Sequence, residues 1–532
     1  MTKPLGRTPV PTPSTSPAGP RRRITRRRLL KGVLIGVPGA AAVGAGGFGW
    51  LWATADVNTV GKVPFARRLA IPPLAASRRD GSGRRVFELR ATAGARRFRS
   101  GKATRTWGFD GGYLGPTLRA ARGETVVVNV RNDLPETTTV HWHGMHLPAA
   151  MDGGPHQPIR PGTTWSPTWK IDQPASTLWY HPHPHGETAR HVYRGLAGLF
   201  ILDDPSAEFV GLPSRYGVDD IPVIVQDKNF GDGNRLDEGH PLMGGLGIMG
   251  DTILVNGTLG PYHDVTTQRV RLRLLNASNA RTYRFVLSDR RPIALVGTDG
   301  GLLPAPHTTG HVELSPGERA EIVVTFRPGD RVVLRSDPSD LGDVGSARFV
   351  GGDDRFDVLE LRATDRLASS PALPGTLAEA PRLGGPDGAE TRVDRRFELS
   401  GTQINGKKMD MGRIDFAVAR DTTEIWEITS LGGKPHNFHV HDTQLQVLSV
   451  AGAAPPPELR GWKDTIFLRA QEPVRVAARF GDYADARTPY MFHCHILYHE
   501  DQGMMGQFVV TEPGQAPALP RTPTTGHGGH HT

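Results

Sequence analysis

The chain has 532 residues, 37% of them hydrophobic and 7% aromatic, so it is long enough for two to four domains with sizeable cores. Its formal charge of +9 comes from one end, because residues 1–55 hold nine Lys and Arg residues and no acidic one. The rest of the chain carries 54 basic and 54 acidic residues, and this balance argues against a nucleic-acid-binding protein.

The basic amino end has the composition of an export signal. Thr25-Arg-Arg-Arg-Leu-Leu-Lys31 precedes an uncharged run from Gly32 to Ala55, and Ala53-Thr-Ala55 offers a small-x-small cleavage site. The segment resembles a twin-arginine signal, so residues 1–55 are expected to engage export machinery and to send the protein to the cell envelope or outside the cell. A retained membrane anchor is the alternative, because the uncharged run is long enough to span a bilayer.

Short strands are expected after the leader. Residues 56–83 show no clear periodicity and predict a linker, whereas Val86–Arg90 and Glu124–Arg131 alternate between apolar and polar residues. The 65 Gly and 45 Pro favour many turns, and helical periodicity is weak throughout. The pattern predicts an all-β series of sandwiches.

The first predicted domain, residues 84–206, contains two His-x-His units, His141-Trp-His143 and His181-Pro-His183. In an extended segment both histidines of a unit lie on one face, a suitable geometry for two ligands that reach a common cluster. Scattered surface histidines would not be ordered in this way.

The second predicted domain, residues 216–365, repeats the strand pattern without any His-x-His unit. Its clearest strands are Arg269–Asn276 and Arg319–Phe326. Residues 366–394 are rich in Pro, Ala and Gly and predict a connector long enough for a third domain to return to the first.

The third predicted domain, residues 395–512, carries the densest set of candidate ligands. It contains a third His-x-His unit, His439-Val-His441, with His436 just before it, and the chain's only cysteine in His493-Cys494-His495, followed by His499 and Met504. One thiolate, two imidazoles and a weak thioether are the ligands of a blue-copper site. If Tyr490–His495 is a strand, Cys494 faces away from its two neighbours, so one tripeptide can serve two metal sites.

The ends of the first and third domains are similar to each other. Gly195–Leu202 aligns with Gly503–Val510, and each follows a His-x-His unit that aromatic residues precede, so these domains are expected to be copies of one β-domain. Residues 513–532 are rich in Pro, Thr and Gly and predict a disordered, His-containing tail.

Taken together, the four His-x-His units resemble the copper-binding motifs of multicopper oxidases, in particular the bacterial laccase-like, three-domain type. Gly115–Leu118, Leu274–Asn279 and Gly461–Thr465 also resemble stretches of that family, so the resemblance runs from about residue 85 to residue 512. It implies three cupredoxin-like Greek-key β-sandwich domains, with metal ligands only in the first and the third, which must therefore meet.

The resemblance also implies four copper ions, one of type 1, one of type 2 and two of type 3. The type 1 ion would be held by His436, Cys494, His499 and axial Met504, and the type 2 ion by His141 and His439. The type 3 pair would be held by His143, His181 and His495 on one ion and by His183, His441 and His493 on the other.

Two acidic residues stand where the family has carboxylates near the cluster. Glu500 follows the ligand His499, and Asp152 lies nine residues after His143. Both are expected to carry protons or to hydrogen-bond the ligands, with an ordinary solvated or turn carboxylate as the alternative. Four more histidines near the motifs are expected to be surface or hydrogen-bonding residues: His146, His156, His185 and His191.

The implied activity is the one-electron oxidation of a donor coupled to the four-electron reduction of O2 to water. Cuprous oxidases of the family commonly carry a methionine-rich insertion. Because this chain has only 10 Met and no such cluster, the resemblance favours phenols, aromatic amines or similar organic donors. The donor pocket should border His436 and His499, with Lys434 and Pro435 as neighbours. The alternatives are a Cu(I) or other metal-ion oxidase, a non-catalytic copper-binding or structural envelope protein, for which missing ligands would be expected, and a nitrite-reductase-like protein, which would not need four His-x-His units.

Overall fold

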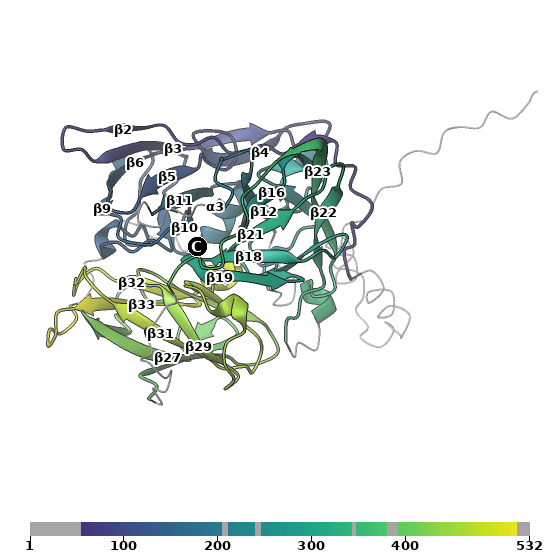
Figure 1. Ribbon diagram of the computed structural model, residues 1–532. Coiled ribbons are helices and arrows are strands. Elements are labelled where there is room, and N and C mark those ends of the chain that lie inside the picture. Colours follow the sequence, from purple (N-terminus) through teal and green to yellow (C-terminus); the bar gives the residue numbers. More distant parts are fainter. Residues whose placement is uncertain are drawn as a thin grey trace, which may run out of the picture. The chain divides into compact units, whose positions relative to one another are not determined.

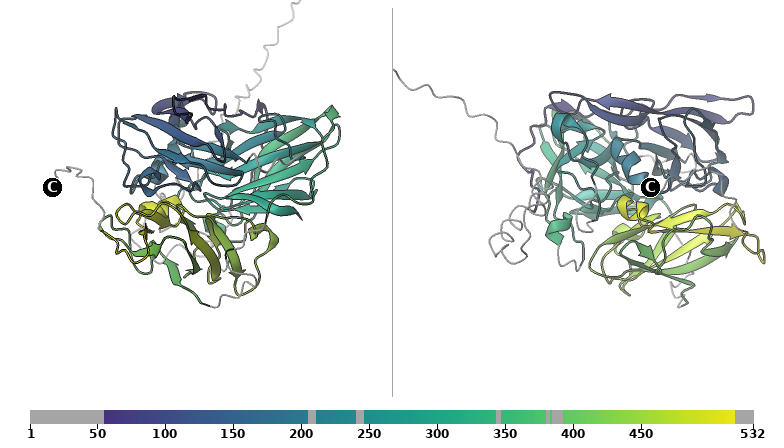
Figure 2. Two further views of the ribbon diagram at one scale, coloured as in Figure 1. Left: turned by 60° about the vertical axis from the view of Figure 1, so that its left-hand side comes forward. Right: turned by 180° about the vertical axis from the view of Figure 1, so that it is seen from behind.

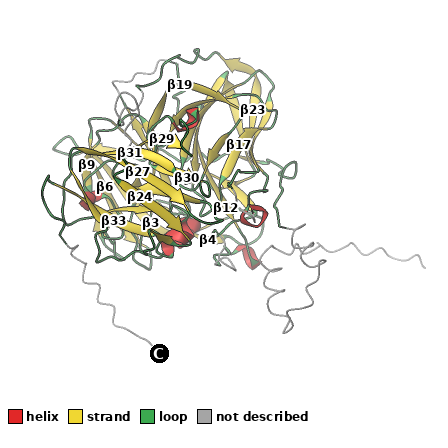
Figure 3. Ribbon diagram, turned by 90° about the horizontal axis from the view of Figure 1, so that it is seen from below, coloured by secondary structure: helices red, strands yellow, loops and turns green. Residues whose placement is uncertain are grey.

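The computed structural model describes residues 55–204, 211–239, 246–342, 347–379, 383 and 392–518. The predicted export segment, apart from Ala55, and residues 519–532 of the predicted tail lie outside these ranges. Strands dominate the described chain (Figure 3), as the all-β prediction requires. Within these ranges no helix has both the length and the apolar character needed to cross a bilayer. The described helices are short: η1 (Ala149–Met151), α3 (Thr188–Arg194), η2 (Asp232–Asn234), η3 (Ala347–Val350), η4 (Pro457–Leu459) and α4 (Leu497–Asp501).

The first sandwich consists of two sheets that enclose an aromatic core. Trp142 is buried in this core together with Trp169 and Phe200, because the central residue of a His-x-His strand faces away from its two histidines. One sheet has the order β2 (Ser77–Arg79), β3 (Arg85–Arg96), β6 (Thr125–Asp133) and β8 (Thr164–Trp165), with β4 (Thr104–Phe109) on β3 and β9 (Thr168–Lys170) on β6; the other has the order β5 (Leu118–Ala121), β11 (Gly198–Asp203), β10 (Ser176–His181) and β7 (His141–His143).

The second sandwich is built in the same way around an aliphatic core that includes Leu272, Ile322 and Leu334. One sheet has the order β1 (Arg67–Arg68), β15 (Pro261–Thr267), β23 (Phe356–Ala368), β22 (Arg331–Asp337), β17 (Tyr283–Leu287) and β20 (Val312–Leu314); the other has the order β14 (Thr258–Leu259), β13 (Thr252–Val255), β12 (Asp220–Lys228), β16 (Arg269–Asn276), β21 (Arg319–Thr325), β18 (Ile293–Thr298) and β19 (Gly301–Thr309).

The third sandwich encloses a second aromatic core, in which Trp426, Phe438 and Phe508 are fully buried. One sheet has the order β25 (Gln403–Ile404), β24 (Arg395–Ser400), β27 (Thr422–Ser430), β31 (Val474–Phe480) and β29 (Leu445–Val450); the other has the order β26 (Phe416–Ala419), β33 (Met505–Thr511), β32 (Tyr490–His493), β28 (His436–Val440) and β30 (Thr465–Leu468). In Figures 1 and 2 the three colour ranges, blue, teal and yellow-green, form three separate groups of strands. The prediction of three cupredoxin-like sandwiches is confirmed.

The sheets that carry the histidines are organised alike in the first and third sandwiches. Strand β11 pairs antiparallel with β10 and parallel with β5, and β33 pairs antiparallel with β32 and parallel with β26. A short helix, α3 or α4, precedes β11 and β33 respectively. This equivalence accounts for the sequence similarity between Gly195–Leu202 and Gly503–Val510.

Two local predictions need correction. The segment 56–83, expected to be a linker, contributes β1 to a sheet of the second sandwich and β2 to a sheet of the first. Both strands are short and fully exposed, so they carry no alternating pattern. The strand expected over Tyr490–His495 ends at His493, and Cys494 lies just beyond it.

Candidate metal centre

A cysteine and two histidines of the third sandwich converge on one buried point. Sγ of Cys494 lies 3.7 Å from Nδ1 of His436 and 3.7 Å from Nδ1 of His499, and the two nitrogens are 3.2 Å apart. A point equidistant from the three atoms lies roughly 2 Å from each, about the length of a metal–imidazole bond. Met504 is fully buried in the same core, and its carbonyl accepts the N–H of Cys494 at 3.1 Å.

Burial sets the protonation of this mononuclear site. It lowers the pKa of His436 to about 4, with a further contribution from Lys434, and it lowers the pKa of His499 well below its ordinary value. These imidazoles are therefore neutral, as metal ligands must be. Burial also raises the pKa of the Cys494 thiol to about 12, so a bound cation is needed to hold the thiolate near pH 7.

Eight other histidines meet where the first and third sandwiches touch. Nε2 of His183 lies 3.1 Å from Nε2 of His493, which in turn lies 3.3 Å from Nε2 of His441. Nδ1 of His143 lies 3.4 Å from Nε2 of His181. Donor atoms within 4.8 Å of one another form the groups His141/His143/His439, His143/His181/His495 and His183/His441/His493. The residues predicted for each cluster ion thus lie together.

Strand pairing explains this convergence. In the first sandwich β7 pairs with β10, so that His141 lies opposite His181. In the third sandwich β28 pairs with β32, so that His439 lies opposite His493. Rings from the two sandwiches then stack across the junction, His141 on His441 and His143 on His439, each with centroids 3.8 Å apart.

Most of the cluster histidines use one ring nitrogen to hold their orientation. Nδ1–H of His141 donates to the carbonyl of Asp152 at 3.0 Å, that of His181 to Pro182 at 2.9 Å, and that of His439 to Asp464 at 2.8 Å. The Nε2 atoms of His141 and His439 are buried and have no hydrogen-bond partner among the described residues, and the same holds for both ring nitrogens of His495. Buried lone pairs left unpaired in this way fit metal ions.

The two predicted carboxylates lie beside the ligands, and both are buried. Oδ2 of Asp152 accepts Nδ1–H of His441 at 2.7 Å. The carboxylate of Glu500 lies 3.3 Å from Nδ1 of His493 and 3.5 Å from Nδ1 of His183. Each side chain is only 1% exposed, so neither is a solvated turn carboxylate.

Four histidines near the motifs, His146, His156, His185 and His191, were not predicted to bind metal. They lie outside the metal groups found among the described residues. Nδ1–H of His146 donates to Asp442 at 2.8 Å, and Nε2 of His156 lies 2.8 Å from Oε1 of Gln507. His191 is buried between Thr138 and Glu136, whereas His185 is exposed.

Several residues that hold the ligands were not singled out from the sequence. Oδ1 of Asn437 accepts the N–H of His495 at 2.6 Å and lies 3.5 Å from Sγ of Cys494. Oδ1 of Asp464 accepts Nε2–H of His143 at 3.0 Å. Asp464 belongs to Gly461–Thr465, and the resemblance of this stretch to the family was the one sequence feature that could have pointed to it.

Sulfur with imidazole at one site, and imidazole alone at the other, are ligand sets that suit copper. The fold and the two sites therefore define a copper-protein scaffold of linked sandwiches. Models of the multicopper oxidase family match residues 90–207 and 384–514. The chain belongs to the multicopper oxidase family, and the assignment made from the sequence is confirmed.

Individual relatives agree on this family. Multicopper oxidase mco of Staphylococcus haemolyticus is 35% identical over 83% of this chain and 92% of its own length. Cell division protein FtsP of Escherichia coli is also 35% identical, over 83% of this chain and 92% of its own length. The crystal structure of a laccase from Pediococcus acidilactici matches with a TM-score of 0.75 and 36% identity, covering 85% of this chain and 95% of that one.

Proposed function

We propose that the chain is an exported, laccase-like oxidase that couples one-electron oxidation of phenols or aromatic amines to the reduction of O2 to water. The observation that carries the proposal is the position of Cys494. Its sulfur belongs to the mononuclear site, while its neighbours His493 and His495 belong to two different triplets of the histidine cluster. One tripeptide therefore joins the site suited to a donor with the site suited to O2.

The proposed cofactor is a set of four copper ions, one of type 1, one of type 2 and two of type 3. When bound, they supply one-electron redox chemistry, so that four donor molecules can deliver the four electrons that one O2 needs. The complete set of buried imidazoles around the cluster supports this loading. The proposed type 1 ligands are His436, Cys494, His499 and Met504, and the other eight histidines are the proposed type 2 and type 3 ligands.

The chain must also deliver four protons for each O2 reduced. Asp152 and Glu500 are the proposed carriers, because each buried carboxylate touches a cluster histidine and none of the twelve proposed ligand positions is a carboxylate. A buried carboxylate that binds and releases a proton is a suitable general acid in a site from which bulk water is excluded.

The donor is expected to approach the mononuclear site. Nδ1 of His436 and Nδ1 of His499 face Cys494, so the opposite edges of both rings point away from the metal position, and these are the edges that the donor is proposed to approach. Lys434 and Pro435 remain the proposed neighbours. A cavity of about 90 Å³ lined by Phe397, Phe416 and Phe492 contains neither histidine, so it is not the proposed donor site.

Metal analysis with optical and paramagnetic spectra, followed by oxygen uptake, tests the proposal. We expect about four coppers per chain, a thiolate charge-transfer band, and uptake of one O2 for every four phenol molecules oxidised. Comparison of a phenol with Cu(I) as donor separates the organic donor from the metal-ion alternative. Failure to load the cluster, or no uptake with either donor by fully loaded protein, would overturn the proposal.

A non-catalytic envelope role is the second candidate, because a relative of equal identity is named as a cell division protein. The complete ligand set favours the oxidase. A protein that binds the full complement of copper but consumes no O2 with any donor would favour the non-catalytic role instead.

A further inference from the structure

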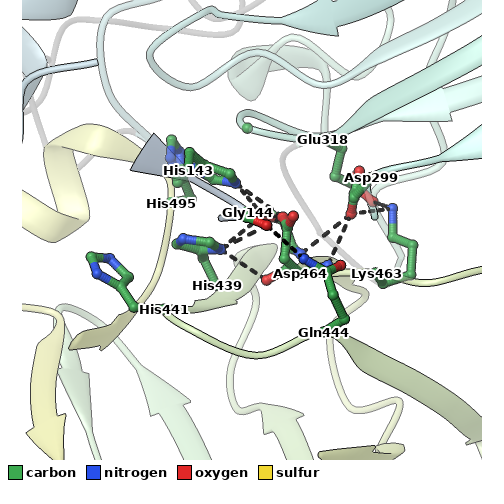
Figure 4. Close-up of polar contacts among 12 residues, drawn as sticks. His143, Gly144, Asp299, Glu318, His439, His441, Gln444, Lys463, Asp464 and His495 are labelled. Atoms are coloured by element: carbon green, nitrogen blue, oxygen red, sulfur yellow. Dashed lines mark hydrogen bonds and ion pairs between the residues drawn. The ribbon is translucent and has the colours of Figure 1, made fainter. Parts of the chain in front are cut away.

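A buried charged network joins the second sandwich to the ligand-bearing third sandwich. Asp299 and Glu318 of the second sandwich face Lys463 and Asp464 of the third (Figure 4), and Arg319 of the second sandwich donates to Asp464. Each of the five residues is at most 3% exposed. Nζ of Lys463 lies 2.8 Å from both Asp299 and Glu318. The second sandwich contributes no proposed copper ligand, yet it places these charges directly behind the cluster.

Arg319 uses every one of its side-chain N–H groups in this network. Nη1 and Nη2 donate to the two oxygens of Asp464 at 2.7 and 2.6 Å, a bidentate pair. Nε, Nη1 and Nη2 also donate to the carbonyls of Thr177, Gly317 and Asp299 at 2.9, 3.1 and 2.9 Å. Because all five donors are engaged, the plane of the guanidinium is fixed and the carboxylate of Asp464 is fixed with it.

Asp464 in turn holds two proposed ligands in place through hydrogen bonds (Figure 4). Its Oδ1 accepts Nε2–H of His143 at 3.0 Å, and its backbone carbonyl accepts Nδ1–H of His439 at 2.8 Å. Oγ1 of Thr465 lies 3.1 Å from the first nitrogen and 3.2 Å from the second. His143 thus has Nε2 committed to the carboxylate and Nδ1 facing Nε2 of His181, whereas His141, His181 and His439 commit Nδ1 to a backbone carbonyl.

The surrounding backbone has no room for an alternative arrangement. A Cβ on Gly144, the residue after His143, would lie 2.5 Å from Oδ2 of Asp464 and 2.7 Å from Nη2 of Arg319. A Cβ on Gly317 would lie 3.0 Å from the ring of His495. Nδ2 of Asn437, whose Oδ1 holds His495, donates to Ser315 and Pro316 at 3.0 and 2.8 Å. The segment Ser315–Arg319 therefore contacts one proposed ligand, His495, and two residues that hold proposed ligands, Asn437 and Asp464.

We propose that Arg319 is a positioning residue for the copper cluster and that the second sandwich, through this residue, is part of the metal centre. Arg319 holds Asp464 so that His143 keeps Nδ1 unprotonated and turned toward Nε2 of His181, and so that the proposed type 2 ligand His439 keeps its Nδ1–H on the carbonyl of Asp464. Without the guanidinium, Oδ2 of the buried carboxylate loses its donor and, of the described residues, only Thr465 and His143 remain on Oδ1, so the carboxylate holds the tautomer and the ring orientation less firmly. The inference rests on the proposed copper loading but not on the identity of the donor.

The test compares Arg319→Lys with Arg273→Lys in the full-length, copper-loaded protein. Arg273 is the matched control, because it is buried in the same sheet and forms a bidentate pair with Asp220, while its hydrogen-bond partners among the described residues, Asp220, Thr177 and Glu321, include no histidine. In Arg319→Lys we expect an altered type 2 paramagnetic signal and cluster copper held on the order of 10- to 100-fold less tightly against a chelator, with the type 1 spectrum unchanged. Arg273→Lys should leave both signals as in the parent protein.

Asp464→Asn tests the same contacts, Arg319 to Asp464 and Asp464 to His143, by changing the carboxylate with almost no change of side-chain volume. It provides the test if Arg319→Lys does not fold. It should alter the same type 2 signal. An unchanged type 2 signal and copper affinity in the folded Arg319 and Asp464 variants, or equal losses in Arg273→Lys, would overturn the inference. If the parent protein itself does not load the cluster, the proposed function fails instead, so the two failures are distinguishable.

Discussion

The mononuclear site and the histidine cluster are built by different means. All four proposed ligands of the mononuclear site come from one sandwich, between His436 and Met504. His436, Cys494 and His499 surround a point inside its core, which also contains Met504. The cluster takes four histidines from the first sandwich and four from the third, so it exists only where the two meet. The first site depends on the packing of one domain, and the second depends on the junction between domains.

The difference explains where buried charge gathers. Around the mononuclear site the neighbours are mainly apolar side chains and the amide of Asn437. Around the cluster stand the carboxylates of Asp152, Glu500 and Asp464, each near a histidine. A junction that must orient rings from two domains and supply protons needs ionic partners, whereas a site inside a single core does not.

The largest expected effect comes from cutting the link between the two sites. Cys494→Ser removes the only sulfur between them, so the thiolate band should disappear and oxygen uptake should fall to background. The cluster histidines are untouched, and about three coppers per chain should remain. Metal analysis and oxygen uptake check this result, and uptake that continues undiminished with a reducing dye would contradict the proposed function as a whole.

The next effect should fall on the cluster alone. Glu500→Gln removes the proposed proton carrier 3.3 Å from His493, so oxygen uptake should drop roughly 100-fold, while anaerobic bleaching of the thiolate band by the donor stays fast. The neighbouring Asp501→Asn is the control, because that side chain caps α3 through Thr188 and Ala189 instead of touching a ligand. Equal losses in both variants would argue against a proton role for Glu500.

The sequence predicted which side chains would lie together because their patterns are local. His-x-His units and the lone cysteine can be found within a few residues, and period-2 alternation places both histidines of a unit on one face. The three-sandwich fold followed from short alternating strands and from the repeat of Gly195–Leu202 in Gly503–Val510. The His-x-His units and the lone cysteine also carry the resemblance to the multicopper oxidase family, which the comparison with its relatives confirms.

The supporting residues could not be predicted because their partners are distant in the chain. Arg319 and Asp464 are 145 positions apart, and nothing near Arg319 distinguishes it from other arginines on strands. Strands β1 and β2 were missed for a different reason, since fully exposed strands of two or three residues bury no face and show no alternation. The leader lies outside the described residues, so export stays a prediction.

Removal of copper should test how far the junction depends on metal. Ligand binding stabilises the folded state by mass action, about 4 kcal/mol where the free metal exceeds its dissociation constant a thousandfold. We therefore expect the chelated protein to unfold at a lower temperature, and copper, but not magnesium, to restore the original value. Calorimetry before and after chelation measures the change, and equal unfolding temperatures would show that the junction holds without metal.

A smaller effect should come from a pH-sensitive contact at the same junction. Burial alone would lower the pKa of His146 in the first sandwich, but Asp442 of the third raises it to about 9. A raised pKa means that the stabilisation is fully present below about pH 6.5 and is lost as pH rises through 9. The parent should be more stable than His146→Gln by on the order of 2 kcal/mol at pH 6, and by almost nothing at pH 10.

Chemical denaturation across this pH range measures the difference. His156→Gln is the matched control, because His156 also crosses from the first to the third sandwich but meets the amide of Gln507. Burial lowers the pKa of His156, so that contact gains no stability from a charge lost between pH 7 and 10. If the two variants behave alike with pH, the ion pair contributes nothing to the junction.

The smallest effect should be confined to the mononuclear site. Met504→Leu replaces the proposed axial thioether with an apolar side chain of similar size, so the fold should lose less than about 1.5 kcal/mol. The reduction potential of the type 1 site should rise and donor oxidation should change only a few-fold, while the cluster signals stay the same. Met505→Leu is the control, since Met505 lies on β33 opposite His493 and is not a proposed ligand. A redox titration separates the two variants, and a potential that moves equally in both would assign the change to packing in the core instead of to the thioether.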